Sequence, residues 1–195
     1  MKSSKGSAFE RDICRKLSLW ISGGKWDDLF WRTSGSGARA TVRSKNSRRT
    51  IGQYGDVHAT SKEGRWFTKL FTIELKRGYN RSSVQDLFDQ NKKSLYKEFI
   101  LQAAEQAKQA CTPYWMLIVK RDRREPLVLI PYLFYDVMCN KEAYDECLIG
   151  CNSMDLCLAN DKKQVDRIII VRLNDWMKFI SPAMTRFVYI RKKNL

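Results

Sequence analysis

Hydrophobic and polar positions follow two different periods along the chain. Apolar side chains recur every three or four positions from 7 to 22 and stop at a glycine pair, which predicts an amphipathic helix. The same period predicts a helix at 95–110, ended by Thr112-Pro113, and a short one at 174–180. Runs of apolar and β-branched residues predict strands at 56–59, 66–76, 114–119, 127–130 and 167–172.

Two local features refine this order. The step Lys62-Glu63-Gly64 between the first two strands is typical of a hairpin turn. Trp26, Phe30 and Trp31 have helical spacing, which favours core packing over base stacking. With 195 residues, the chain is expected to form one domain with an elaboration.

The charge balance points to a polyanionic partner. Lys and Arg outnumber Asp and Glu by 36 to 21, giving a net charge of +15, and nucleic acid is the first candidate. No acidic residue occurs from 33 to 55, where arginine and lysine accumulate in a basic loop. The longest wholly apolar run, 114–119, is far short of a membrane span, and the start MKSSKGS does not resemble a signal peptide. We therefore expect a cytoplasmic protein without membrane contact.

Six cysteines in a chain without a recognisable secretion signal are expected to be reduced thiols. Four of them lie between 139 and 157 at irregular spacing, with no CxxC pair and no histidine nearby. Buried thiols are therefore favoured over a structural zinc site.

The main chemical signal is Asp56, followed eighteen residues later by Glu74-Leu75-Lys76. Alternation along a strand puts Glu74 and Lys76 on one face and Leu75 on the other. Two carboxylates could hold a hard divalent cation, and the ammonium could orient or deprotonate a water or stabilise charge developing at phosphorus. Phosphodiester hydrolysis needs these parts, although an ExK tripeptide alone is also common on an exposed edge strand.

Glu10 has two interpretations. It falls within the apolar arc of the helix at 7–22, so its carboxylate points inward and needs a partner. Ser7 to Glu10 fits a capping box, in which the carboxylate bonds the start of its own helix. Alternatively, Glu10 belongs to the site of Asp56 and Glu74.

In this order, these residues resemble the PD-(D/E)xK nuclease superfamily, and more particularly the archaeal and phage Holliday junction resolvases. The resemblance covers roughly residues 4–120 and rests on five segments. They are the KGxxxER-type opening at 5–11, the arginine and small-residue loop at 32–38, the aspartate Asp56, the ExK strand at 73–76, and a Gln- and Lys-containing helix at 101–108 before the strand at 114–119. Gly55 stands where the family usually has proline.

The resemblance implies an α/β fold with a restriction-endonuclease-like core, a central mixed β-sheet flanked by helices. This core would occupy residues 1–135, including the basic loop 38–54, and a C-terminal elaboration, 136–195, would pack on it. The resemblance also implies Mg²⁺, for which Mn²⁺ is expected to substitute, and Lys76 beside the attacking water. The implied metal ligands are Glu10, Asp56, Glu74 and the backbone carbonyl of Leu75.

Other residues are candidates for contacts with the substrate. Ser34, Ser36 and Gln102 are possible accessory groups, whereas Gln106 and Gln109 are expected to be solvated and His58 to be structural. The candidates for DNA binding are Arg32, Arg39, Arg43, Lys45, Arg48, Arg49 and Arg81.

Three functions remain open. The leading expectation is a Mg²⁺-dependent endonuclease selective for branched DNA, acting as a homodimer in DNA recombination and of phage or mobile-element origin. The second is a sequence-specific endonuclease of restriction or homing type. The third is a nucleic-acid-binding module on a non-catalytic nuclease scaffold, which the full set of catalytic groups argues against.

Overall fold

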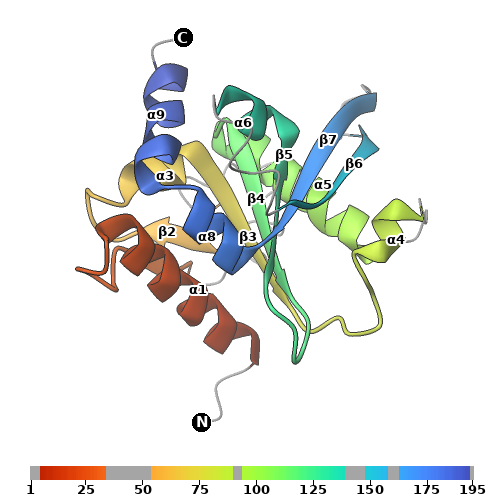
Figure 1. Cartoon of the computed structure of the whole chain (residues 1–195), viewed down its shortest axis with the longest axis horizontal. Helices are drawn as coiled ribbons and strands as arrows, with labels where there is room; N and C mark the ends of the chain where they lie inside the picture. Colours follow the sequence, from red (N-terminus) through yellow and green to blue (C-terminus); the bar gives the residue numbers. More distant parts are fainter. Residues whose placement is uncertain (1–4, 34–53, 90–93, 139–147, 158–162, 194–195) are drawn as a thin grey trace, which may run out of the picture.

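The computed structural model describes residues 5–33, 54–89, 94–138, 148–157 and 163–193, with the backbone alone in 148–157 and 163–166. Its centre is a five-stranded sheet of order β3-β4-β5-β7-β6 (Figure 1). Only β3 and β4 run parallel within it, and the other neighbours are antiparallel, so the sheet is mixed. The strands are β3 Phe71–Arg77, β4 Tyr114–Lys120, β5 Leu127–Pro131, β6 Leu148–Cys157 and β7 Lys163–Arg172.

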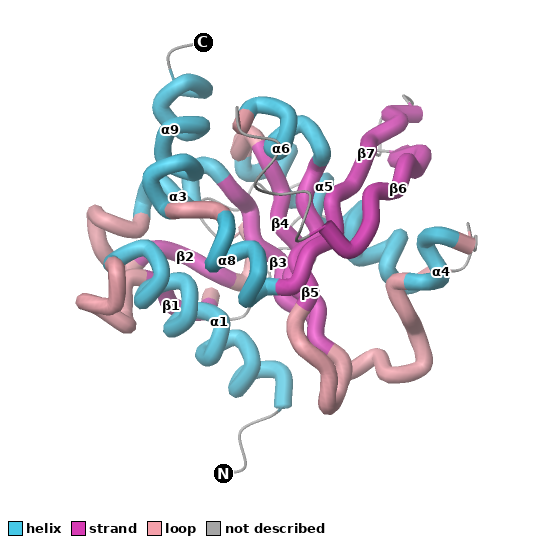
Figure 2. Tube along the Cα trace, in the orientation of Figure 1, coloured by secondary structure: helices cyan, strands magenta, loops and turns pink. Residues whose placement is uncertain are grey.

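Helices cover both faces of this sheet (Figure 2). On one face, alternate β3 residues Phe71, Ile73 and Leu75 join a core with α1 (Lys5–Ser22), α3 (Arg65–Leu70), α6 (Tyr132–Val137), α8 (Leu173–Phe179) and α9 (Pro182–Lys193). On the other face, Trp115, Leu117 and Val119 of β4 pack against α4 (Gln85–Phe88) and α5 (Leu95–Ala110). The expected α/β architecture, a mixed sheet flanked by helices, is confirmed.

The parallel pairing of β3 and β4 follows from the connection between them. Parallel neighbours need a long crossover, and here α4 and α5 supply it across one face. This crossover places α5 over the residues of β3 that point away from the α1 side. Since strand residues alternate, Thr72, Glu74 and Lys76 are on the α5 face.

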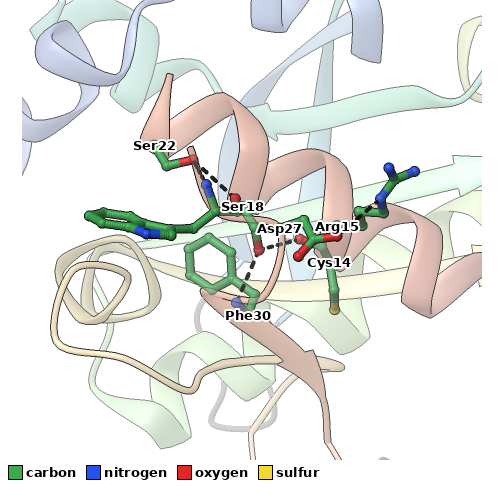
Figure 3. Close-up of polar contacts among 7 residues, drawn as sticks. Cys14, Arg15, Ser18, Ser22, Asp27 and Phe30 are labelled. Atoms are coloured by element: carbon green, nitrogen blue, oxygen red, sulfur yellow. Dashed lines mark hydrogen bonds and ion pairs between the residues drawn. The ribbon is translucent and has the colours of Figure 1, made fainter. Parts of the chain in front are cut away.

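A second small sheet lies beside β3. Its strands, β1 Phe30–Arg32 and β2 Val57–Ala59, pair antiparallel. Buried Ser18 of α1 fixes β1 in place: its hydroxyl donates to the Cys14 carbonyl at 2.7 Å and accepts from the Phe30 N–H at 3.1 Å (Figure 3). An ion pair between Arg15 and Asp27, at 3.5 Å, joins the same segments at the surface. The contacts from α1 therefore hold β1 in position, and β2 is held through its pairing with β1.

The strand predicted at 66–76 is wrong in its first half. Residues Arg65–Leu70 form α3, and β3 begins only at Phe71. Trp66, Phe67 and Leu70 are all buried on this short helix, where Phe67 contacts the rings of Trp20 and Trp176. Packing against α1 and α8 thus overrides the strand propensity of an aromatic-rich segment. The predicted hairpin is wrong as well, because β2 pairs with β1 and the turn at 62–64 leads into α3.

The core packing predicted from the spacing of Trp26, Phe30 and Trp31 is correct for Phe30 and wrong for the two tryptophans. Phe30 is fully buried, but Trp26 and Trp31 are each 50% exposed. Phe30 and Trp31 are successive residues of β1, so they point to opposite faces of that strand.

The remaining predicted elements are confirmed as α1, α5, β2, β4, β5, β7 and α8. The pattern missed β1, α4, α6, β6 and α9, which are short or lack a clear period. In the C-terminal part, β7 pairs with β5 inside the sheet, and Trp176 and Val188 are fully buried in the shared core. The division into 1–135 and 136–195 stays a prediction. Among the helices in the described part of the chain, none is long and apolar enough to cross a membrane.

Candidate active site

Asp56 lies at the open edge of β3. The Asp56 N–H donates to the Ile73 carbonyl at 2.7 Å, and the Leu75 N–H donates to Asp56 Oδ2 at 2.8 Å. Gly55 makes this approach possible, because its φ is +75° and a Cβ there would meet the Ile73 carbonyl oxygen at 2.8 Å. The glycine at position 55 thus has a structural cause.

These contacts also orient the carbonyl of Leu75. The N–H and C=O of one strand residue point to the same side of the strand. Since the Leu75 N–H points to Asp56, away from β4, its carbonyl faces the same edge. A backbone oxygen therefore lies on the side where the Asp56 carboxylate stands.

Glu74 is the most deeply buried carboxylate of the site, with 2% of the residue exposed. Its Oε2 accepts hydrogen bonds from Lys76 Nζ at 3.1 Å and from Gln102 Nε2 at 3.2 Å. Burial, followed by repulsion from Asp56, raises the pKa of Glu74 to about 7, against the lowering effect of Lys76. The predicted convergence of Asp56, Glu74 and Lys76 is thus present in the geometry.

Gln106 is the residue that sequence reasoning missed. Its Oε1 accepts the Gly55 N–H at 2.7 Å, and its side chain also lowers the pKa of Glu74 through a hydrogen bond. The side chain therefore links α5 to both carboxylate-bearing segments. A usable signal existed, since Gln102 and Gln106 are four residues apart and share one face of α5.

Lys76 lies between the carboxylates and an aromatic side chain. Its ammonium is 5.4 Å from the centre of the Phe99 ring on α5, and its side chain is 17% exposed. The ion pair with Glu74 and the ring together hold the ammonium at the mouth of the site.

Glu10 reaches the same region from α1 but has a different partner. Arg32 Nη1 of β1 donates to Glu10 Oε2 at 3.2 Å. Burial and the charge of Asp56 raise the pKa of Glu10, whereas Arg32 lowers it. Ser7 lies inside α1 and is not the residue preceding the helix, so the geometry of a capping box is not present.

Among the described residues, the other candidates from the sequence do not join the cluster of Asp56, Glu74 and Lys76. Arg81 is exposed in the loop after β3, and His58 is exposed on β2 opposite Trp31. Of the four cysteines between 139 and 157 no side chain is described, whereas Cys14 is a buried free thiol and Cys111 an exposed one. The candidates that lie outside the described residues are Ser34, Ser36, Arg39, Arg43, Lys45, Arg48 and Arg49.

The donor set at the edge of β3 fits a hard divalent cation. Within the described residues, no three His, Cys, Asp or Glu side chains converge closely enough to hold a metal by themselves. The edge offers instead two carboxylates, Asp56 and Glu74, and the Leu75 carbonyl, all of them oxygen donors. A bound cation would also offset the repulsion that Asp56 exerts on Glu74.

A mixed sheet flanked by helices, with Glu-x-Lys on its edge strand and an aspartate fixed against that edge, defines a nuclease of the PD-(D/E)xK class. Enzymes of this class generally use divalent metal ions. Residues 1–185 match the family described as phage putative PDDEXK endonuclease, and the chain belongs to that family. The mention of phage in the description of this family agrees with the phage or mobile-element origin expected from the sequence. Searches of curated proteins and of solved structures found no match.

Proposed function

We propose that this endonuclease is a metal-dependent enzyme that cleaves branched DNA. The observation that carries the catalytic part is the convergence of Asp56, Glu74 and Lys76 at the open edge of β3. The preference for branched DNA rests on the likeness of residues 4–120 to Holliday junction resolvases.

The residues divide the chemical work between them. Asp56, Glu74 and the Leu75 carbonyl would hold Mg²⁺, which when bound lowers the pKa of water and offsets charge at the phosphoryl group. Lys76 sits beside these groups and is suited to orient the attacking water and to stabilise negative charge on the phosphate. Gln102 and Gln106 hold Glu74 in position from α5. Glu10 is a further candidate ligand, which would have to leave Arg32.

DNA is the substrate that the charge of the protein favours. The net charge of +15 would steer a polyanion to the molecule, and the exposed Arg81, Arg123 and Arg124 lie in loops beyond the ends of β3 and β4. The basic loop 38–54 adds five further arginines and lysines between β1 and β2. We propose that this loop governs affinity and that the edge of β3 governs the chemistry.

Branched DNA implies a particular assembly. Resolution of a four-way junction needs two cuts, and one chain supplies one candidate site, so we propose a twofold homodimer. The division into a core of residues 1–135 and an elaboration of 136–195 belongs to the same proposal, with the elaboration shaping the substrate surface.

The deciding experiment compares supercoiled plasmid, linear duplex and four-way junction DNA, each with Mg²⁺ and with EDTA. Metal-dependent nicks that flank the branch, and that move when the branch is moved within the arm sequences, would support the proposal. Cuts that stay with a base sequence would favour the restriction or homing alternative. Binding without cleavage, by a protein whose fold is verified, would leave only the scaffold alternative.

A further inference from the structure

A half-exposed aromatic side chain stands close to Lys76. Tyr79, in the loop after β3, is 49% exposed, and its ring centre lies 4.8 Å from that of Phe99 in an edge-on arrangement. Phe99 is the ring over which the Lys76 ammonium sits at 5.4 Å. The two distances share the Phe99 centre, so the Tyr79 ring is at most about 10 Å from that ammonium, the span of roughly three stacked nucleotides.

The loop that carries Tyr79 is tied down on both sides. Arg121 Nη2 donates to the Asn80 carbonyl at 2.7 Å, and the Asp122 N–H donates to Asn80 Oδ1 at 2.9 Å. The Gly78 N–H donates to the Lys120 carbonyl at 3.0 Å. In Figure 1 the loop leaves β3 beside the turn between β4 and β5, which supplies these partners. The aromatic ring is therefore presented on a fixed support.

The backbone at Tyr79 is also unusual. Its φ is +49°, in the left-handed region that a bulky residue rarely adopts. Such a conformation is kept when surrounding contacts enforce it, and here those contacts hold the loop while Tyr79 as a residue stays about half exposed. Burial of the ring in the core does not account for its position.

The charge of the two loops indicates the kind of ligand. They carry four arginines, Arg81, Arg121, Arg123 and Arg124, against two acidic residues, Asp122 and Glu125, and Lys76 lies behind Phe99. An exposed aromatic ring on loops of net positive charge matches a nucleobase attached to its phosphates. In an intact duplex both faces of every base are covered by its neighbours, so only an unstacked base can lie on Tyr79.

The geometry points to Tyr79 as a stacking platform for an unpaired base within about three nucleotides of the phosphate at Lys76. The substrate class is then DNA with an unstacked base near the cut, as at a branch point, a flap or a single-stranded end. This inference rests on the proposed function, and it names the feature of the DNA that the protein would recognise, an unstacked base. Tyr79 would be a specificity-determining residue and would take no part in the chemistry.

The test measures binding in EDTA, so that cleavage plays no part in it. Wild type, Tyr79→Leu and Tyr79→Phe are titrated with a four-way junction, a single strand carrying 2-aminopurine, and a matched duplex. The leucine keeps apolar bulk against Phe99 but loses the aromatic face. Phe187→Ala, which alters a comparably exposed ring on α9, is the control, and thermal melting verifies each fold.

We expect Tyr79→Leu to lose about 5- to 150-fold in affinity for the junction and the single strand, with duplex affinity within twofold. Quenching of 2-aminopurine emission should occur with wild type and Tyr79→Phe and disappear with Tyr79→Leu. Equal losses on all three DNAs, or unchanged affinity and quenching, would overturn the inference. Cleavage of plasmid with Mg²⁺ is scored separately, so failure of the nuclease proposal is distinguishable from failure of the platform.

Discussion

Glu74→Gln should stabilise the metal-free protein while abolishing cleavage. Burial and the charge of Asp56 raise the pKa of Glu74 from an ordinary 4.5 to about 7. Ionised Glu74 is therefore disfavoured in the folded state by about 3 kcal/mol above pH 7. Because the proton binds more tightly in the folded state, this contribution favours folding fully below about pH 4.5 and is lost as the pH rises through 7.

Glutamine removes the charge but keeps an oxygen that can accept from Lys76 and Gln102. The variant should therefore gain up to about 3 kcal/mol over wild type at pH 8, a large share of a typical folding free energy, and almost nothing at pH 4. Glu98→Gln, an exposed change on α5, is the matched control and should show no such gain.

The assay is urea unfolding in EDTA at pH 4, 6 and 8, read by tryptophan fluorescence. Added Mg²⁺ should stabilise wild type and leave Glu74→Gln unchanged, because only wild type keeps both carboxylates. If the variant is no more stable than wild type at pH 8, Lys76 and Gln102 already compensate the buried charge. The argument from the burial of Glu74 and its repulsion by Asp56 would then be refuted.

Four further changes test other parts of the structure. Gln106→Ala should lower the cleavage rate more than DNA affinity, since it frees the Gly55 N–H and a contact of Glu74, whereas Gln109→Ala on the exposed face should leave both unchanged. Gly55→Ala should cost more than about 1 kcal/mol in chemical denaturation and abolish cleavage, because its Cβ would strike the Ile73 carbonyl; full activity would contradict the assignment of Asp56. Glu10→Gln should reduce the cleavage rate with little loss of stability if Glu10 serves the site, and normal turnover would limit it to the ion pair with Arg32. Trp176→Ala should cost about 3–5 kcal/mol and lower a single cooperative transition, and two separate transitions would show that 136–195 unfolds independently.

Local periodicity determined much of the sheet and its main helix. The bounds 95–110 were predictable because α5 presents a clean apolar face and is ended by Thr112-Pro113. Strand alternation alone was enough to put Glu74 and Lys76 on one face, since the direction of a side chain depends on the strand and not on its neighbours. The convergence of Glu74 and Lys76 with Asp56 was therefore predictable from one short segment and one distant aspartate.

Tertiary packing decided the rest. Whether 66–70 is strand or helix depended on Phe67 meeting Trp20 and Trp176, residues more than forty positions away. Gln106 became part of the site only because α5 crosses the face of β3, which brings it to Gly55 across fifty-one positions. A sequence pattern records which side of an element is apolar. It does not record which distant element will cover that side. The partners of Glu10, Gly55 and Gln106 were therefore decided by the tertiary packing of α1, β1 and α5.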